Sequence, residues 1–139
     1  MIVLDTNVVS EMLRLRPEPR VLSWASRLGE PTALTSVTAW ELQFGLGRMP
    51  EGRRREQLTV ALERVLHDAS GSILAFDEAA ARCAASMRVD RERVGRPVAT
   101  ADVQIAGICQ ARRATLATRN TKDFEGLGVD LVNPWDSAA

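Results

Sequence analysis

The chain has 139 residues, of which 45% are hydrophobic and 26% charged, and its formal net charge is zero. This length suits one domain with its own core, so we expect a single domain over residues 1–139. The neutral balance excludes a global positive field that would attract nucleic acid. The sequence lacks an apolar run approaching the roughly 18 residues of a membrane helix, and Asp5 interrupts any secretory leader, so a cytoplasmic protein is expected.

The chain begins with a short apolar run, Ile2-Val3-Leu4, that leads directly into Asp5. Continuous apolar runs are typical of strands that are covered on both faces of a parallel sheet. Asp5 then lies at the carboxyl end of its strand, which is the edge where open α/β sheets bind ligands. The alternative is that Asp5 only caps the next helix, because Asp is a favoured N-cap residue.

Strand and helix patterns alternate along the rest of the chain. Apolar spacing and turn residues predict further strands at 32–35, 73–76, 115–118 and 129–132. They also predict helices at 8–13, 19–28, 51–69 and 98–113. Two more helices are expected to start at N-caps: one at Ser36 or Thr38, ending at about 47–50, and one at Asp77, ending near Arg93. Such alternation implies right-handed crossovers between parallel strands. The predicted fold class is therefore α/β, with a mostly parallel central sheet of four to five strands flanked by helices on both faces.

Two acidic residues, Glu41 and Asp102, fall on helix faces that are otherwise apolar. The i, i+3, i+4, i+7 spacing gives the two stripes Val37, Trp40, Glu41 and Phe44 in one helix and Val98, Ala101, Asp102, Ile105 and Cys109 in the other. Burying an unpaired carboxylate costs several kcal/mol, so such groups are paired, protonated or bound to a metal. Pairing of each acid with an Arg remains the alternative to a functional site.

The three acids Asp5, Glu41 and Asp102 are expected to converge, because helix N-termini and strand carboxyl ends share one edge of a parallel sheet. Carboxylates without nearby His or Cys are hard oxygen ligands, which suit Mg²⁺ or Mn²⁺ better than zinc. The only histidine, His67, is expected on the surface of an outer helix, so a Ser-His-Asp triad or a zinc–His site has nothing to be built from. Cys83 and Cys109 are isolated and are expected to be reduced, structural thiols.

Further polar residues follow the predicted strand 115–118. Asn120 could orient a metal-bound water, and that role and an ordinary loop position remain equally open. Asp123 could add a fourth acid, although a cap of the following turn is the preferred interpretation. Seventeen of the 18 basic residues are Arg, which can hold a phosphate through two parallel hydrogen bonds, although a solvated face is the preferred explanation of any single Arg cluster.

The sequence resembles the PIN-domain ribonucleases, in particular the VapC and FitB-like toxins of bacterial toxin–antitoxin pairs. The motifs that carry the resemblance are Leu4-Asp5-Thr6-Asn7, Trp40-Glu41-Leu42-Gln43, Ala101-Asp102-Val103-Gln104, Thr118-Arg119-Asn120-Thr121 and Asn133-Pro134-Trp135. Each motif alone is weakly specific, but together they occur in the family's order over the length of the chain. Three of them contain the acids that the residue patterns had already marked as unusual.

The resemblance implies an Mg²⁺-dependent endoribonuclease in which Asp5 and Asp102 bind the metal and Glu41 completes its coordination. Mn²⁺ is the alternative metal. It places Asn120 where many relatives have Asp, so the fourth position differs from the usual acidic quartet. It also implies RNA as the substrate, an antitoxin protein as the partner and a homodimer, with the helix at 51–69 as a candidate antitoxin surface. The alternatives are a non-catalytic acidic groove that captures an Arg-bearing protein, and a phosphoacceptor signalling domain, for which the sole lysine, Lys122, lies beyond the expected strand.

Overall fold

The computed structural model of the chain describes residues 1–137 and contains a five-stranded sheet in which every pairing is parallel. The strands are β1 (Ile2–Leu4), β2 (Thr32–Thr35), β3 (Ile73–Leu74), β4 (Thr115–Ala117) and β5 (Leu131–Val132), in the spatial order β3-β2-β1-β4-β5. β1 is therefore the central strand. The predicted α/β class and the strand number are confirmed.

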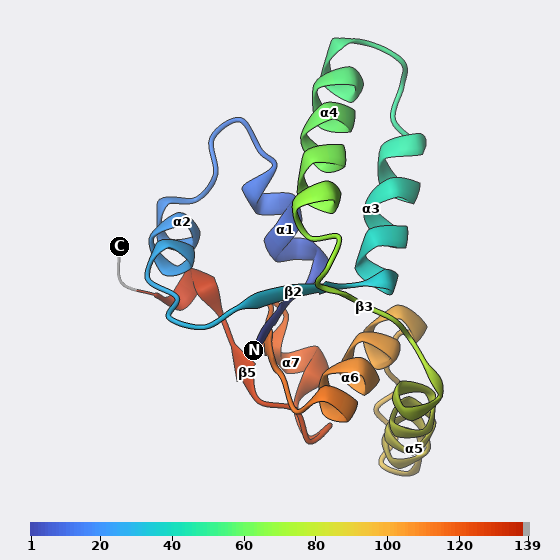
Figure 1. Cartoon of the computed structure of the whole chain (residues 1–139). Helices are drawn as coiled ribbons and strands as arrows, with labels where there is room; N and C mark the ends of the chain where they lie inside the picture. The colour runs from blue at the N-terminus through green and yellow to red at the C-terminus, as the bar shows by residue number, and fades with distance from the viewer. Residues whose placement is uncertain (138–139) are drawn as a thin grey trace.

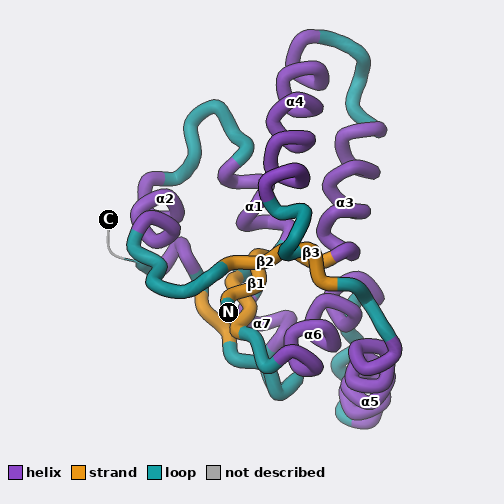
Figure 2. The backbone as a smooth tube through the Cα atoms, viewed as in Figure 1, coloured by secondary structure: helices purple, strands orange, loops and turns teal. Residues whose placement is uncertain are grey.

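Helices cover both faces of this sheet (Figures 1 and 2). They are α1 (Thr6–Met12), α2 (Pro19–Ser26), α3 (Ser36–Gly47), α4 (Arg53–Asp68), α5 (Glu78–Arg93), α6 (Thr100–Arg112), α7 (Thr121–Phe124) and the 3₁₀ turn η1 (Pro134–Asp136). No helix within residues 1–137 combines the length and hydropathy that crossing a bilayer requires. In Figure 1, α3 and α4 project together from one side of the sheet, while α5 and α6 pack on the other.

The strand residues alternate between two apolar layers. Val3 and Leu116 point into a core with α5, α6 and Phe124, whereas Ile2 and Ala117 point into a core with α1, α2 and Trp24. Because both faces are covered, the strands need continuous apolar runs, which is the pattern that the sequence shows. The register Leu4↔Ala117 brings the ends of β1 and β4 together, so the residues that follow each strand are neighbours.

Several predicted boundaries were wrong by a few residues. The third strand stops at Leu74 because the chain turns away, and the backbone N–H of Phe76 donates instead to Ser36 Oγ at 3.3 Å. The cap of α3 is Thr35, whose hydroxyl accepts from the N–H of Thr38 at 3.0 Å, and neither Ser36 nor Thr38 has that role. The helix predicted at 98–113 starts at Thr100, after the extended residue Ala99.

A buried arginine, Arg91, fixes the end of α5 to the region after β4. Its side chain is 6% exposed, and its guanidinium donates to the carbonyl oxygens of Asp123 at 2.8 Å, Glu125 at 2.7 Å and Arg96 at 3.4 Å. A buried charge is tolerated when its donors are satisfied in this way. The segment that carries Asn120 and α7 is thereby held against the body of the domain.

Candidate active site

A cavity of about 510 Å³ lies at the carboxyl ends of β1 and β4 and contains every site residue that the sequence predicts. Its lining residues are Asp5, Thr6, Asn7, Ser10, Glu11, Arg14, Glu41, Asp102, Arg119, Asn120 and Trp135. Asp5 ends β1, Glu41 belongs to α3, Asp102 to the first turn of α6, and Asn120 to the segment after β4. The structure thus brings together side chains that are separated by more than a hundred residues in sequence, while their catalytic roles remain predictions.

Asp5 is a buried carboxylate at the floor of the cavity, with only 4% of its surface exposed. Its Oδ1 accepts from the N–H of Thr6 at 2.8 Å, which makes it the N-cap of α1. Its Oδ2 accepts from the Thr118 hydroxyl at 2.7 Å and from Asn7 Nδ2 at 3.3 Å. The cap and the site are therefore not alternatives, because capping fixes the carboxylate at the edge of the sheet.

Glu41 reaches the cavity from α3 and is held by a hydroxyl from α1. Thr6 Oγ1 donates to Glu41 Oε1 at 2.7 Å and lies 3.1 Å from Thr38 Oγ1. The predicted buried stripe around Glu41 was wrong in part, because Trp40 is 59% and Phe44 52% exposed. α3 packs through Leu42 and Leu46 into a cluster with Val9 of α1 and Leu62 of α4, and Figure 1 shows α4 running alongside it, so Trp40 and Phe44 lie on the uncovered face of α3.

Asp102 differs from the other two acids because its carboxylate has no hydrogen bond within residues 1–137. Burial raises the pKa of Asp102 from 3.8 to about 6, with further contributions from the negative charges of Asp5, Asp123 and Glu41. Burial also raises the pKa of Asp5, against the effect of its hydrogen bonds. Clustered carboxylates of this kind favour protonation or a cation that relieves their repulsion.

Pairing with Arg does not neutralise these acids. None of Asp5, Glu41 and Asp102 forms an ion pair within the described part of the chain, and Arg14, the nearest cation in the lining with a carboxylate partner, pairs with Glu11 at 3.3 Å. Residues 1–137 also contain no group of three His, Cys, Asp or Glu side chains that forms a ready-made metal cluster. The donor chemistry nevertheless fits a hard divalent cation, because it consists of carboxylate oxygens without cationic partners.

Asn120 and Asp123 have different positions. Asn120 lines the cavity beside the three acids, and its N–H donates to Thr118 Oγ1 at 3.1 Å. Asp123 lies inside α7, so its predicted role as a cap was wrong. It lines a neighbouring hollow, which it shares with Asp102.

Sequence reasoning missed two hydroxyl residues, Thr6 and Thr118, that orient the acids. Thr118 is fully buried, and its Oγ1 donates to Asp5 while accepting from the N–H of Asn120. Thr6 makes the corresponding contact with Glu41. Thr118 directly follows β4 and Thr6 comes two residues after β1, so a hydroxyl close behind a strand end was the available signal.

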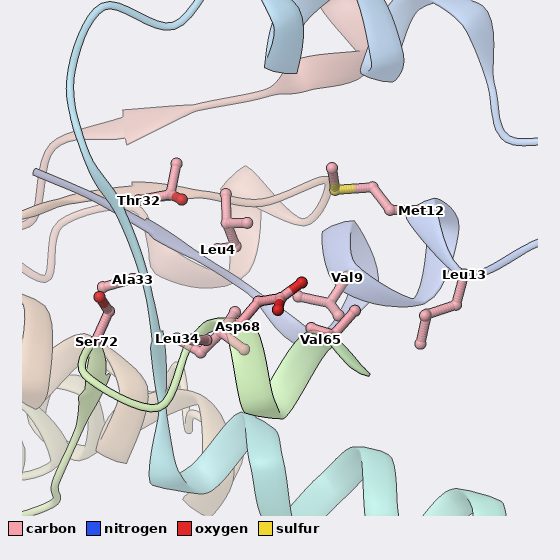
Figure 3. A pocket seen from close by; sticks show the side chains of 11 residues that line it. Leu4, Val9, Met12, Leu13, Thr32, Ala33, Leu34, Val65, Asp68 and Ser72 are labelled. Atoms are coloured by element: carbon pink, nitrogen blue, oxygen red, sulfur yellow. The ribbon is translucent and has the colours of Figure 1, made fainter. Parts of the chain in front are cut away.

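Two other hollows border α4 and have a different chemistry. The first, of about 290 Å³, is mainly apolar, with side chains from β1, β2, α1 and α4 such as Leu4, Leu34 and Val65 (Figure 3). The second, of about 260 Å³, lies between α1, α3 and α4 and shares Thr6 and Glu41 with the acidic cavity. These hollows suit apolar side chains of a protein partner, since only Asp68 and Glu41 add negative charge.

Comparison with known proteins shows which family this site belongs to. A profile of the PIN domain matches residues 2–128. The chain is 40% identical over 140 residues to the VapC ribonuclease Y4jK of Sinorhizobium fredii, covering 99% of this chain and 100% of that protein. It is 38% identical to the toxin FitB of Neisseria gonorrhoeae over 97% of this chain and 99% of that protein. The structure also matches a crystal structure of FitAcB from Neisseria gonorrhoeae with a TM-score of 0.90, and the match covers 98% of this chain and 99% of the FitAcB chain. The chain therefore belongs to the PIN domain family.

Proposed function

We propose that this protein is an Mg²⁺-dependent endoribonuclease and the toxin of a toxin–antitoxin pair. The observation that carries the proposal is the convergence of Asp5, Glu41 and Asp102 on one cavity without a neutralising Arg among the described residues. Relatives named as a VapC ribonuclease and as the toxin FitB support the activity and its biological setting. Mn²⁺, which also prefers oxygen ligands, is expected to substitute for Mg²⁺.

Asp5 and Asp102 would hold the cation, and Glu41 would complete its coordination directly or through a water. When bound by these residues, a divalent cation would supply activation of a water and neutralisation of the charge that develops on the scissile phosphate. Thr118 and Thr6 orient the carboxylates of Asp5 and Glu41 through the hydrogen bonds that they donate. Asn120 is placed to orient a reacting water or a phosphate oxygen in the same cavity.

An antitoxin would bind in the two apolar hollows along α4. Met12, which is 37% exposed, lines the first of them, and the second opens toward the acidic cavity through Glu41. FitAcB and FitAB from relatives were solved as complexes, one of them bound to DNA. We expect the product of an adjacent small reading frame to copurify with this protein, and Met12→Glu to weaken that complex more than Val60→Glu, which changes an exposed residue of α4 outside both hollows.

The remaining parts of the proposal concern the whole chain. We propose that the nuclease domain spans residues 1–139, although the last two lie outside the described residues, and that it acts in the cytoplasm as a homodimer. Sedimentation equilibrium would test the dimer, with a constant monomer mass over a wide concentration range as the contradicting result.

The activity is tested by incubating purified protein with labelled total RNA and with a single-stranded RNA. Cleavage with 5 mM Mg²⁺, on the order of a usual assay concentration, should disappear with EDTA and in Asp5→Asn, which preserves the shape of the helix cap. Asp130→Asn is the matched control, because Asp130 is exposed and lies outside the cavity. Equal cleavage by Asp5→Asn and the control would refute the proposal. Binding without cleavage would favour the non-catalytic groove.

A further inference from the structure

The acidic cavity is the middle part of a longer polar groove. A hollow of about 390 Å³ shares Glu11, Arg14, Arg119 and Trp135 with it, and another, of about 360 Å³, shares Asp102. The three hollows are therefore neighbours, with the acidic cavity bordering both of the others. The first outer hollow shares Arg14 and Arg119 with the acidic cavity and adds Arg16, while the second adds Arg96 and Lys122.

On the first side, Arg119 is the cation best placed to bind a ligand. Its backbone is fixed, because its N–H donates to Asn7 Oδ1 at 3.2 Å and its carbonyl accepts from Asn133 Nδ2 at 3.5 Å. Its guanidinium carbon lies 5.0 Å from the centre of the Trp135 ring, a cation–π arrangement that holds the side chain without using its charge on a carboxylate. Arg119 has no ion pair within residues 1–137, so its five donors remain available to an anion.

On the second side, Arg96 and Lys122 line the hollow next to Asp102. Both side chains are exposed and lack an ion pair in the described residues. The guanidinium of Arg91 holds the backbone next to both residues. It donates to the carbonyl oxygen of Arg96 and to that of Asp123, the residue after Lys122. Arg91 thus ties the loop that carries Arg96 to α7, and both segments line the same hollow.

We propose that this groove binds a single RNA strand, with Arg119 and the Arg96–Lys122 pair holding phosphates on opposite sides of the scissile bond. The inference rests on the proposed ribonuclease activity and adds the path of the substrate and the residues that position it. The charge order along the groove is cationic, acidic, cationic, which suits a strand whose central phosphate meets a metal and whose neighbours meet guanidinium and ammonium groups. The paired Arg119 and Trp135 also offer a flat surface beside the path on which an unpaired base can stack.

Two properties of the chain favour this occupant. A formal net charge of zero means that nucleic acid must be attracted by a local arrangement of cations, and the groove supplies one. Phosphate contacts give affinity and position without reading sequence, so the groove would orient any strand while other contacts select the cleavage point. Arg119, Arg96 and Lys122 are therefore positioning residues.

The test measures binding separately from cleavage. A fluorescent single-stranded RNA of about twelve nucleotides, within the usual range of single-strand site sizes, is titrated with full-length Asp102→Asn protein by fluorescence anisotropy over a range of KCl concentrations. Each phosphate contact contributes about 0.7 to the slope of log K against log salt for a single strand. We expect Arg119→Ala to lower the slope by about 0.7 and Arg96→Ala with Lys122→Ala to lower it by about 1.4. The combined variant should lose both contributions, because one strand contacts both sides.

Two matched variants separate charge from structure. Arg119→Lys should retain the slope that Arg119→Ala loses, and Arg64→Ala should leave it unchanged, because Arg64 is exposed on α4 and lines none of the three hollows. An unchanged slope in either the Arg119→Ala or the Arg96→Ala, Lys122→Ala protein would overturn the inference. Failure of the proposed activity would instead show as absence of Mg²⁺-dependent cleavage by the wild-type protein, whatever the binding slopes are.

Discussion

Replacing Asp102 by Asn should stabilise the metal-free protein while it abolishes cleavage. Asp102 is the acid whose carboxylate has no hydrogen bond or ion pair within residues 1–137, so an isosteric amide loses no such contact. The pKa of Asp102 is raised from 3.8 to about 6, which means that its ionised form is unfavourable in the folded state. Active sites store this kind of electrostatic cost, and the Asn variant removes it.

The magnitude follows from linkage between protonation and folding. The full shift, at about 1.4 kcal/mol per pKa unit, corresponds to about 3 kcal/mol. The side chain is only partly buried, so solvent screening reduces the expected gain to about 1 to 2 kcal/mol. Because the pKa of Asp102 is raised in the folded state, the free energy of unfolding of the wild-type protein falls by this amount as the pH rises from about 4 to about 6. The loss is complete above pH 6.

Urea unfolding in EDTA at several pH values measures the effect. At pH 7.5, Asp102→Asn should unfold at a higher urea concentration than wild type, with an unchanged m-value. Below pH 4, where wild-type Asp102 is protonated in the folded state, the difference should vanish. Asp130→Asn, on an exposed residue, should stay within about 0.5 kcal/mol of wild type. A variant that is less stable than wild type at pH 7.5, or whose gain is independent of pH, would refute the reasoning.

Other predictions concern the core. Gly107→Ala should destabilise the fold by about 2 to 4 kcal/mol in urea unfolding, because a Cβ there would lie 2.5 Å from the carbonyl oxygen of Ala80, whereas Gly45→Ala, with open space, should be neutral or stabilising. Arg91→Ala should cost about 3 kcal/mol in the free energy of unfolding, since it removes the donors to the carbonyl oxygens of Asp123 and Glu125, and unchanged stability would contradict that role. Burial raises the pKa of Cys109 to about 12, so iodoacetamide at pH 8 should label it only after unfolding, as mass spectrometry would show.

The layered fold was predictable because its signals are local. Ile2-Val3-Leu4 is apolar throughout, as a strand covered on both faces requires, and the acid after it marks the sheet edge. The boundaries were less predictable because long-range contacts set them. The third strand ends at Leu74 only because Phe76 bonds to Ser36, which is distant in sequence.

The candidate site was predictable to the extent that a residue contradicted its own surroundings. Asp102 stood out because its helix face is otherwise apolar, and the structure places Ile105 and Cys109 of that face in the core. The same reasoning overestimated the burial of Trp40 and Phe44, because helical spacing does not reveal that α3 packs against α1 and α4 through Leu42 and Leu46 instead. The contact of Thr118 with Asp5 joins positions 113 residues apart, so a hydroxyl close behind a strand could be noticed in the sequence but its partner could not.

The most direct test measures the affinity for Mn²⁺ by electron paramagnetic resonance at pH 7.5. It compares the wild-type protein with the variants Asp5→Asn, Glu41→Gln and Asp102→Asn. If the three acids of β1, α3 and α6 form one cation site, each single substitution should weaken binding at least tenfold, or about 1.4 kcal/mol, while Asp130→Asn leaves it unchanged. Wild-type affinity in all three site variants would contradict the account.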